Sequence, residues 1–185
     1  MASGSPRRRE LLCAAGFIFE TVVPGTKEVE APGEGTRDMV ARLARDKALA
    51  VSSEYLNAWV IGADTTVDVD GKPFSKPRDR NDAFRMLNIL NGRSHLVHTG
   101  ISIARGGEER TSFVETTKVI FGSLSREDIA SFVESGLCDD KAGAYAIQGR
   151  GSLLVERIEG CYYNVMGLPV YRLKKVLGDL IPDLF

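Results

Sequence analysis

The spacing of hydrophobic positions along the chain changes several times, from a helical repeat of about 3.6 residues to an alternation of two. Segments with the helical repeat predict five helices, over 6–15, 36–53, 79–91, 125–135 and 168–177. Three of them stop at a glycine, which suits a helix C-terminus. In the second helix, Thr36 is the expected N-cap, and Lys47 lies beside the apolar stripe rather than opposite it.

Segments rich in aromatic and β-branched residues predict the strands. They cover 17–23, 58–64 and a long hairpin over 94–121 that turns at Gly106-Gly107, with a further tight turn at Asp70-Gly71. Helical and strand patterns therefore alternate, which is typical of an α/β or mixed α+β fold. The length suits one domain over residues 1–185, and the chain shows no repeat and no linker.

Composition limits the classes of partner. Lys and Arg number 24 against 25 Asp and Glu, so the chain has no cationic field for nucleic acid, and any anion site must be local. The three cysteines show no metal-binding spacing, and all are expected to be buried thiols: Cys13, Cys138 and Cys161. No apolar run is long enough to span a membrane, so a cytoplasmic protein without a membrane partner is expected.

The stretch "SGSPRRRELL" at 3–12 is the first candidate for chemistry. Arg7 and Arg8 fall in the first turn of a predicted helix, where free N–H groups and the helix dipole favour an anion. A solvated basic face explains the same residues equally well. Arginine at this end of a helix opposes the dipole, however, and needs compensation.

Two acids and two lysines are further candidates, each with an ordinary structural explanation. Asp64 ends the apolar strand "VIGA", a position at which sheets often place ligand-binding groups, although a turn or capping role is commoner. For Glu28 and Lys47, the ordinary explanation is a charged side chain that is simply solvated. Lys76 precedes a proline that holds the chain extended and so restricts its direction.

Several common sites are excluded by the sequence. The chain contains no phosphate-binding loop of the G-x-x-x-x-G-K-[ST] type, no G-x-S-x-G and no H-E-x-x-H. "GRGSLL" lacks the third glycine of a dinucleotide loop. His95 and His98 stand three apart on a strand, on opposite faces, which makes them poor joint metal ligands.

Taken together, the motifs resemble the Maf family of nucleotide pyrophosphatases over essentially the whole chain. They are "SGSPRRRELL", Glu28, "ARDKA" around Lys47, "GADT" at 62–65, "SKP" at 75–77, "HTG" at 98–100, "DKAGAYAIQG" at 140–149 and "NVMGLP" at 164–169. The resemblance departs at the N-terminus, where the family usually has a few strand residues before "AS". Residues upstream of Met1 are therefore expected.

The resemblance implies an elongated mixed sheet flanked by helices around a central cleft, similar to inosine-triphosphate pyrophosphatases, and a homodimer. It implies hydrolysis of nucleoside triphosphates to monophosphate and pyrophosphate with Mg²⁺ or Mn²⁺. Pyrimidine-selective members, which act on dTTP and UTP, share "GADT" and the glutamine of "IQG". Relatives that act on 7-methyl-GTP differ at both places.

Site residues follow from the same resemblance. The phosphate end of the substrate is matched by Ser3, Arg7 and Arg8, and the catalytic cleft by Glu28, Lys47, Asp64 and Lys76. Glu28 and Asp64 are the expected metal ligands, and one of them, with Asp64 favoured, would also activate water. Thr65 and Gln148 match the positions that separate subfamilies. The alternative, from a different class, is a non-catalytic nucleotide-binding regulator of cell division.

Overall fold

A five-stranded sheet forms the centre of the computed structural model, which describes residues 1–139 and 141–184. Its strands are β1 (Val60–Val69), β2 (Lys72–Phe74), β3 (Ser94–Arg105), β4 (Glu108–Phe121) and β5 (Val155–Glu159). They lie in the order β2-β1-β3-β4-β5, and every pair of neighbours is antiparallel. Among the described residues, parallel pairing is confined to isolated bridges from Ala2 to Val22 and to Gly62. The expected mixed α/β class with helices around a sheet is confirmed.

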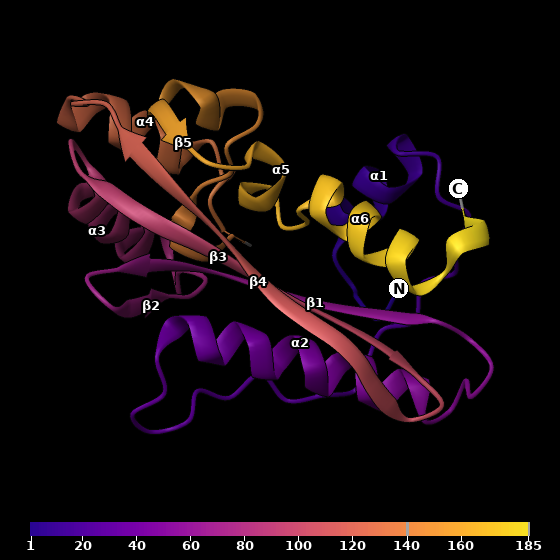
Figure 1. Ribbon diagram of the computed structural model, residues 1–185. Coiled ribbons are helices and arrows are strands. Elements are labelled where there is room, and N and C mark those ends of the chain that lie inside the picture. The colour runs from indigo at the N-terminus through magenta and orange to yellow at the C-terminus, as the bar shows by residue number, and fades with distance from the viewer. Residues whose placement is uncertain (140, 185) are drawn as a thin grey trace.

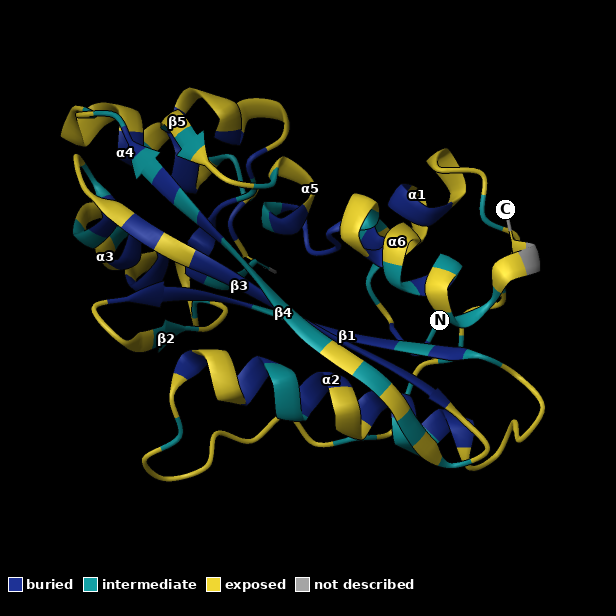
Figure 2. Cartoon of the chain, viewed as in Figure 1, coloured by how far each residue is buried: buried dark blue, intermediate teal, exposed yellow. Residues whose placement is uncertain are grey.

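Helices cover the sheet from both sides (Figure 1). They are α1 (Pro6–Ala14), α2 (Thr36–Ser52), α3 (Arg80–Leu90), α4 (Arg126–Glu134), α5 (Tyr162–Val165) and α6 (Val170–Leu180), and short 3₁₀ turns occupy Ala142–Ala144, Gly149–Leu153 and Pro182–Leu184. The long helix α2 runs along one face, whereas α1 and α6 gather near one end of the long strands and α3 and α4 near the other. Figure 2 shows buried residues on the side of α2 that faces the sheet.

Two apolar clusters hold these groups of helices on the sheet. Around α3 and α4, Leu87 and Ile129 pack with Phe121 of β4. Around α1 and α6, Leu12 and Leu173 belong to the second cluster, together with residues of β1 and β3. Members of both clusters line one cavity, Val67, Val97 and Tyr145 from the first and Ile147 and Met166 from the second.

Two glycines let α2 approach the sheet closely. A Cβ atom built on Gly62 of β1 would lie 2.1 Å from the carbonyl oxygen of Ala44, and one on Gly100 of β3 would lie 2.2 Å from that of Val40. Since real Cβ atoms cannot approach so closely, only glycine permits this packing. The close packing brings Lys47 of α2 within reach of Asp64, two residues after Gly62.

We expect Gly62→Ala to lower the free energy of unfolding by roughly 2 kcal/mol, because the added methyl group must push α2 off β1. The matched control is Gly178→Ala in α6, where an added Cβ meets nothing within 4 Å. A helical glycine replaced by alanine should raise stability by up to about 1 kcal/mol. Urea unfolding of both variants checks the prediction, and it is wrong if the two changes have the same effect.

Most of the predicted elements are confirmed. The helices near 6–15, 36–53, 79–91, 125–135 and 168–177 form with small shifts at their ends, and the last runs from Val170 to Leu180. The hairpin turns at Gly106 and Gly107. Both glycines have positive φ, and so do Asp70 and Gly71 at the tight turn. Ser125 and Asp128 form a capping box at the start of α4.

Four details of the sequence prediction are wrong. Residues 17–23 form no strand, because only the short segment at Ala2 pairs with them, through Val22. Gly35 is the N-cap of α2, since the side chain of Thr36 donates a hydrogen bond to Asp68 instead. The strand expected over 58–64 continues to Val69, paired with both β3 and β2. Cys13 is exposed and Cys161 half-buried, so only Cys138 is a buried thiol.

Candidate functional site

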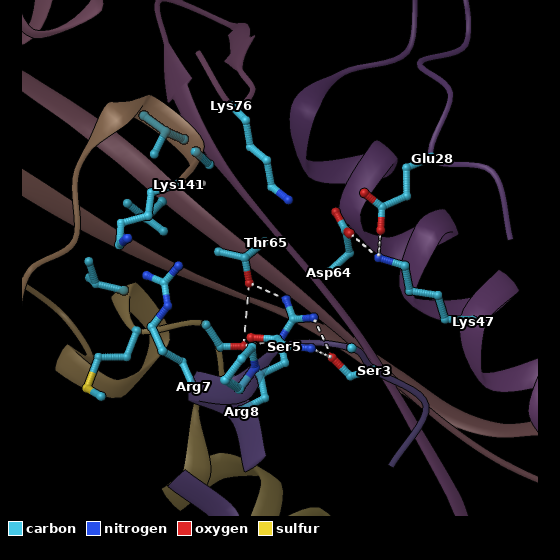
Figure 3. Close-up of a pocket in the computed structure, with 18 of the residues that line it drawn as sticks. Ser3, Ser5, Arg7, Arg8, Glu28, Lys47, Asp64, Thr65, Lys76 and Lys141 are labelled. Atoms are coloured by element: carbon cyan, nitrogen blue, oxygen red, sulfur yellow. Dashed lines mark hydrogen bonds and ion pairs between the residues drawn. The ribbon is translucent and has the colours of Figure 1, made fainter. Parts of the chain in front are cut away.

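A cavity of about 510 Å³ opens between α1, β1 and the segment that follows β2. All but one of the site residues expected from the sequence line it (Figure 3): Ser3, Arg7, Arg8, Glu28, Lys47, Asp64, Thr65 and Lys76. Segments separated by more than 70 residues thus supply one group of polar side chains. Two acids and four cations of this group face a single space, as the sequence motifs predict.

Lys47 joins the two acids. Its Nζ lies 2.6 Å from Oδ1 of Asp64 and 2.6 Å from Oε1 of Glu28. The Lys47 and Asp64 side chains are only 7% and 11% exposed, whereas that of Glu28 is 59% exposed. The Lys47 ammonium therefore neutralises the buried carboxylate of Asp64, whose charge burial would otherwise destabilise. Its second partner, Glu28, is exposed to solvent.

The two acids differ in their protonation. Burial raises the pKa of Asp64 above its ordinary value, and this effect outweighs the opposing influence of Lys47 and Arg8. Partial desolvation acts in the same direction on Glu28, but the hydrogen bond and charge of Lys47, with Lys76 and Arg8, hold the pKa of Glu28 below its ordinary value. Asp64 is therefore the more basic carboxylate, and Glu28 is the one that stays ionised most readily.

Arg8 is buried in the wall of the cavity and is held by neutral groups. Its guanidinium donates to the carbonyl oxygens of Gly167 (2.9 Å) and Ala63 (2.8 Å) and to the hydroxyls of Ser3 (3.3 Å) and Thr65 (2.8 Å). Burial lowers the pKa of Arg8, and the charges of Asp64 and Glu28 oppose that shift. The residue thus ties the N-terminal segment to β1 and to the segment after α5.

Arg7 and the start of α1 form the part of the cavity lining next to Arg8. The side chain of Arg7 forms no hydrogen bond or ion pair with residues 1–139 or 141–184. The first helical hydrogen bond runs from Arg9 N to Ser5 O, so the N–H groups of Arg7 and Arg8 precede the helical pattern. Ser3 Oγ accepts the N–H of Ser5 (3.1 Å), which shapes the turn that leads into the helix.

Two lysines approach the cavity from the other wall (Figure 3). Lys76 follows β2 and is exposed, and within the described part of the chain it has no hydrogen bond or ion pair. Lys141 also lines the cavity. Lys141 is not among the site residues predicted from the sequence, although the motif "DKAGAYAIQG" contains it, because a lysine in a loop gives no signal of its own.

The structure places Gln148 apart from the other expected residues. Its side chain is exposed, and it does not line the cavity, whereas Tyr145 and Ile147 of the same segment do. These two contribute, with Val67, Val97 and Met166, to an apolar part of the lining. Gln148, expected to match a position that separates subfamilies, therefore lies outside the lining of this cavity.

His95 fixes Tyr145 from behind the cavity wall. Its Nε2 lies 2.6 Å from the Tyr145 hydroxyl, and its Nδ1 is buried without a hydrogen-bond partner among the described residues. Burial lowers the pKa of His95 from 6.5 to about 4, and it raises the pKa of Tyr145. Tyr145 therefore lines the cavity while its hydroxyl is hydrogen-bonded to His95.

Because of His95, the folding stability of the protein is expected to decrease in acid. Between pH 6.5 and 4 the unfolded chain binds a proton at His95 and the folded chain does not, so stability falls as the pH falls through that window. The difference between the two pKa values corresponds to about 3 kcal/mol. Urea unfolding at pH 7 and pH 4 should show a smaller decline for His95→Phe than for the unaltered protein. Equal declines would contradict the assignment, because His98 and the carboxylates are common to both chains.

The donor set of the two acids fits a divalent cation. Each carboxylate keeps one oxygen, Oδ2 of Asp64 and Oε2 of Glu28, that forms no hydrogen bond with residues of the described ranges. Mg²⁺ takes one or two carboxylates and completes its shell with water and phosphate oxygens. In residues 1–139 and 141–184, no cluster of three or more His, Cys, Asp or Glu side chains could hold a metal unaided. The protein's own ligands would thus leave coordination positions for phosphate.

Among the described residues, no helix has the length and apolar character needed to cross a membrane.

Comparison with known proteins identifies a matching family and several similar bacterial proteins. The family described as "Maf-like protein" matches residues 1–180. A dTTP/UTP pyrophosphatase of Symbiobacterium thermophilum is 49% identical over 177 residues, which cover 96% of this chain and 91% of that protein. The dTTP/UTP pyrophosphatase of Vibrio cholerae is 49% identical over 178 residues, with 96% and 95% covered.

One solved structure, a nucleoside-triphosphatase / dITP/XTP pyrophosphatase of Mycobacterium abscessus, aligns over 99% of this chain and 97% of its own. The identity is 15% and the TM-score 0.43. The family match over residues 1–180 and the extent of identity to the two bacterial relatives establish that this chain belongs to the Maf-like protein family.

Proposed function

We propose that the protein hydrolyses nucleoside triphosphates between the α and β phosphorus atoms and releases a monophosphate and pyrophosphate. The observation that carries the proposal is the meeting of two carboxylates with several cationic side chains in one cavity of about 510 Å³. A triphosphate brings about four negative charges near neutral pH, and the cleavage develops more charge on the leaving pyrophosphate. A cavity for this reaction needs both fixed cations and an acid.

The cations are proposed to bind the phosphate chain. Arg7 has donors that no described residue uses, and it lies beside the N–H groups that open α1. Such a helix start favours an anion through its N–H groups and its dipole. Lys76 and Lys141 stand across the cavity, so that a triphosphate lying between the walls is contacted from two sides.

The acids are proposed to act at the α phosphorus. Glu28 and Asp64 would hold Mg²⁺ or Mn²⁺ through the oxygens that Lys47 does not use. A bound metal would neutralise phosphate charge and polarise the phosphoryl oxygens. Asp64 is proposed to orient the attacking water and accept its proton, because it is the buried carboxylate of the pair and Lys47 fixes its position.

The substrate class is proposed to be dTTP and UTP. Two relatives, 49% identical to this chain, carry the name dTTP/UTP pyrophosphatase. The apolar part of the lining, which includes Val67, Val97 and Ile147, offers a surface for a planar base at a distance from the cationic residues.

We further propose that residues 1–185 act as one domain, that the protein is a cytoplasmic homodimer, and that it binds neither nucleic acid nor membrane.

Pyrophosphate release from dTTP, UTP, 7-methyl-GTP and ATP, with Mg²⁺ or Mn²⁺, tests the proposal. We expect release from dTTP and UTP, and its loss on addition of EDTA. Orthophosphate as the first product would show a phosphatase instead. Nucleotide binding without any release, measured by calorimetry, would favour the non-catalytic regulator.

A further inference from the structure

Glu28 stands on a segment without regular secondary structure. The described residues 23–35, which we call the Glu28 loop, form neither helix nor strand, and the one backbone hydrogen bond within them runs from the N–H of Glu34 to the carbonyl oxygen of Ala31. The Glu28 side chain is exposed and is held by Lys47 at 2.6 Å. An ion pair with an exposed partner contributes little by itself. The position of this acid therefore depends on further contacts of the loop.

Arg42 of α2 supplies such contacts. Its Nε lies 2.7 Å from Oε1 of Glu34 and its Nη2 lies 2.6 Å from Oε2, so two hydrogen bonds join the guanidinium to one carboxylate. Nη2 also donates to the carbonyl oxygen of Val29, the residue after Glu28, at 3.0 Å. Nη1 lies 3.5 Å from Oδ2 of Asp46, one turn further along α2. The guanidinium thus holds the loop at two places, and one of them adjoins Glu28.

The pair of Arg42 and Glu34 differs from an ordinary surface ion pair. The Glu34 side chain is only 14% exposed, and that of Arg42 is 35% exposed. The hydrogen bond between them lowers the pKa of Glu34 and raises the pKa of Arg42, so both groups stay ionised at neutral pH. A forked pair of this kind can stabilise a structure where a single exposed contact does not.

Arg42 and Lys47 act on the same loop from the same helix. They stand five residues apart on α2, which corresponds to about 7.5 Å along the helix axis. Lys47 contacts the carboxylate of Glu28, and Arg42 contacts the backbone next to it. Figure 1 shows the chain before α2 running alongside that helix. A longer contact, 3.4 Å from Ser75 Oγ to Glu30 Oε1, joins the loop to the segment after β2.

We propose that Arg42 is a positioning residue that holds the Glu28 loop against α2 and thereby keeps the Glu28 carboxylate at the cavity, ready to bind a divalent cation. The inference rests on the proposed function for the role of that cation. Arg42 does not line the cavity, so it acts on a metal through Glu28. A ligand that is fixed before binding loses less conformational freedom when the cation arrives.

The sign of the expected effect separates positioning from charge. Removal of a positive charge near a cation site would by itself favour the binding of a metal. Loss of the tether should do the opposite, because Glu28 would then be free to move away from the cavity. Weaker metal binding after neutralisation of Arg42 is therefore the result that positioning alone predicts.

Tryptic cleavage after Lys27 tests the tether without nucleotide or metal. Lys27 is exposed and immediately precedes Glu28 in the loop. Cleavage of a folded protein at such a site follows the population of states in which the segment is detached. Arg42→Gln should speed cleavage of this bond about threefold or more, as followed by mass spectrometry. Glu34→Gln breaks the same pair from the loop side and should have the same effect, so the test does not depend on one variant.

Arg45→Gln is the matched control. Arg45 lies on the same helix, is exposed, and pairs with Glu109 of β4 at 3.5 Å rather than with the Glu28 loop. The control removes the same charge and should be cleaved after Lys27 at the rate of the unaltered protein. Unaltered cleavage in Arg42→Gln and Glu34→Gln would overturn the proposal, and so would equal acceleration in Arg45→Gln.

Mn²⁺ binding to the protein alone, measured by electron paramagnetic resonance, tests the consequence for the cation. The Kd should rise about threefold or more in Arg42→Gln and stay unaltered in Arg45→Gln. In a Glu28→Gln background, Arg42→Gln should cause no further rise, because the effect passes through Glu28. An unaltered Kd, or the same rise in both backgrounds, would show that Arg42 does not position Glu28. Failure of the unaltered protein to bind Mn²⁺ would instead contradict the metal role in the proposed function, and the cleavage rates would still decide whether Arg42 holds the loop.

Discussion

Asp64→Asn is expected to lower kcat by at least about a hundredfold, equivalent to about 2.7 kcal/mol of activation free energy. The amide keeps the shape of the side chain and can still accept the hydrogen bond of Lys47, 2.6 Å away in the unaltered protein. The amide is far less basic, however, and a weaker ligand for a cation. The substitution therefore removes both roles proposed for the Asp64 carboxylate, that of orienting water and that of binding metal. Steady-state kinetics with dTTP, and circular dichroism as a check on folding, measure the effect.

Asp68→Asn is the matched control for this change. Asp68 lies four residues further along β1, is also buried, and contacts Thr36, Gly71 and His98 rather than the cavity. We expect it to lower stability while kcat stays within about threefold, about 0.7 kcal/mol. If Asp64→Asn retained more than a tenth of the original kcat, about 1.4 kcal/mol, the assignment of Asp64 as a catalytic residue would be wrong.

Lys47→Met should impair both turnover and stability. The ammonium is the described partner of Asp64 Oδ1 and of Glu28 Oε1, and its removal leaves a buried carboxylate without its counter-ion. Breaking such a buried pair costs about 3 kcal/mol. Loss of the contact that fixes Asp64 should also lower kcat about a hundredfold or more, because a catalytic group must be held in position. Urea unfolding and kinetics measure the two effects separately.

Lys76→Met provides the comparison. It removes the same charge from the same cavity, but Lys76 is exposed and contacts neither carboxylate within ion-pair distance. We expect little change in stability and a rise in KM that exceeds the fall in kcat, since Lys76 is proposed to bind phosphate. Equal stability losses in the two lysine variants would show that net charge, and not the bridge between the acids, determines the effect.

Local signals in the sequence explain why most of the fold could be predicted. Glycines with positive φ at 16, 92 and 136 follow three of the helices, and Gly106 with Gly107 marks the hairpin turn. The strand over 17–23 was wrong because its apolar residues suit a strand locally, while pairing depends on a neighbour that the pattern does not reveal. The short strand β5 (Val155–Glu159) was missed because its pairing with β4 lies more than 30 residues away in sequence.

Site residues were found through motifs, and their roles depended on contacts that motifs do not show. The cavity contains Glu28, Lys47 and Asp64 together, as the motifs predict, but the bridging position of Lys47 follows from the approach of α2 that Gly62 permits. The partners of Arg8 include Gly167, 159 positions away. No spacing rule could have shown that its donors are already engaged.

The proposed cleavage between the α and β phosphorus atoms is tested most directly by hydrolysis of dTTP in ¹⁸O-labelled water. Mass spectrometry of the products locates the oxygen that water supplied. Attack of water at the α phosphorus, as proposed, predicts one ¹⁸O atom in the monophosphate and none in pyrophosphate. Label in pyrophosphate would place the attack at the β phosphorus, and labelled orthophosphate would show removal of the terminal phosphate. Either result would contradict the proposed reaction.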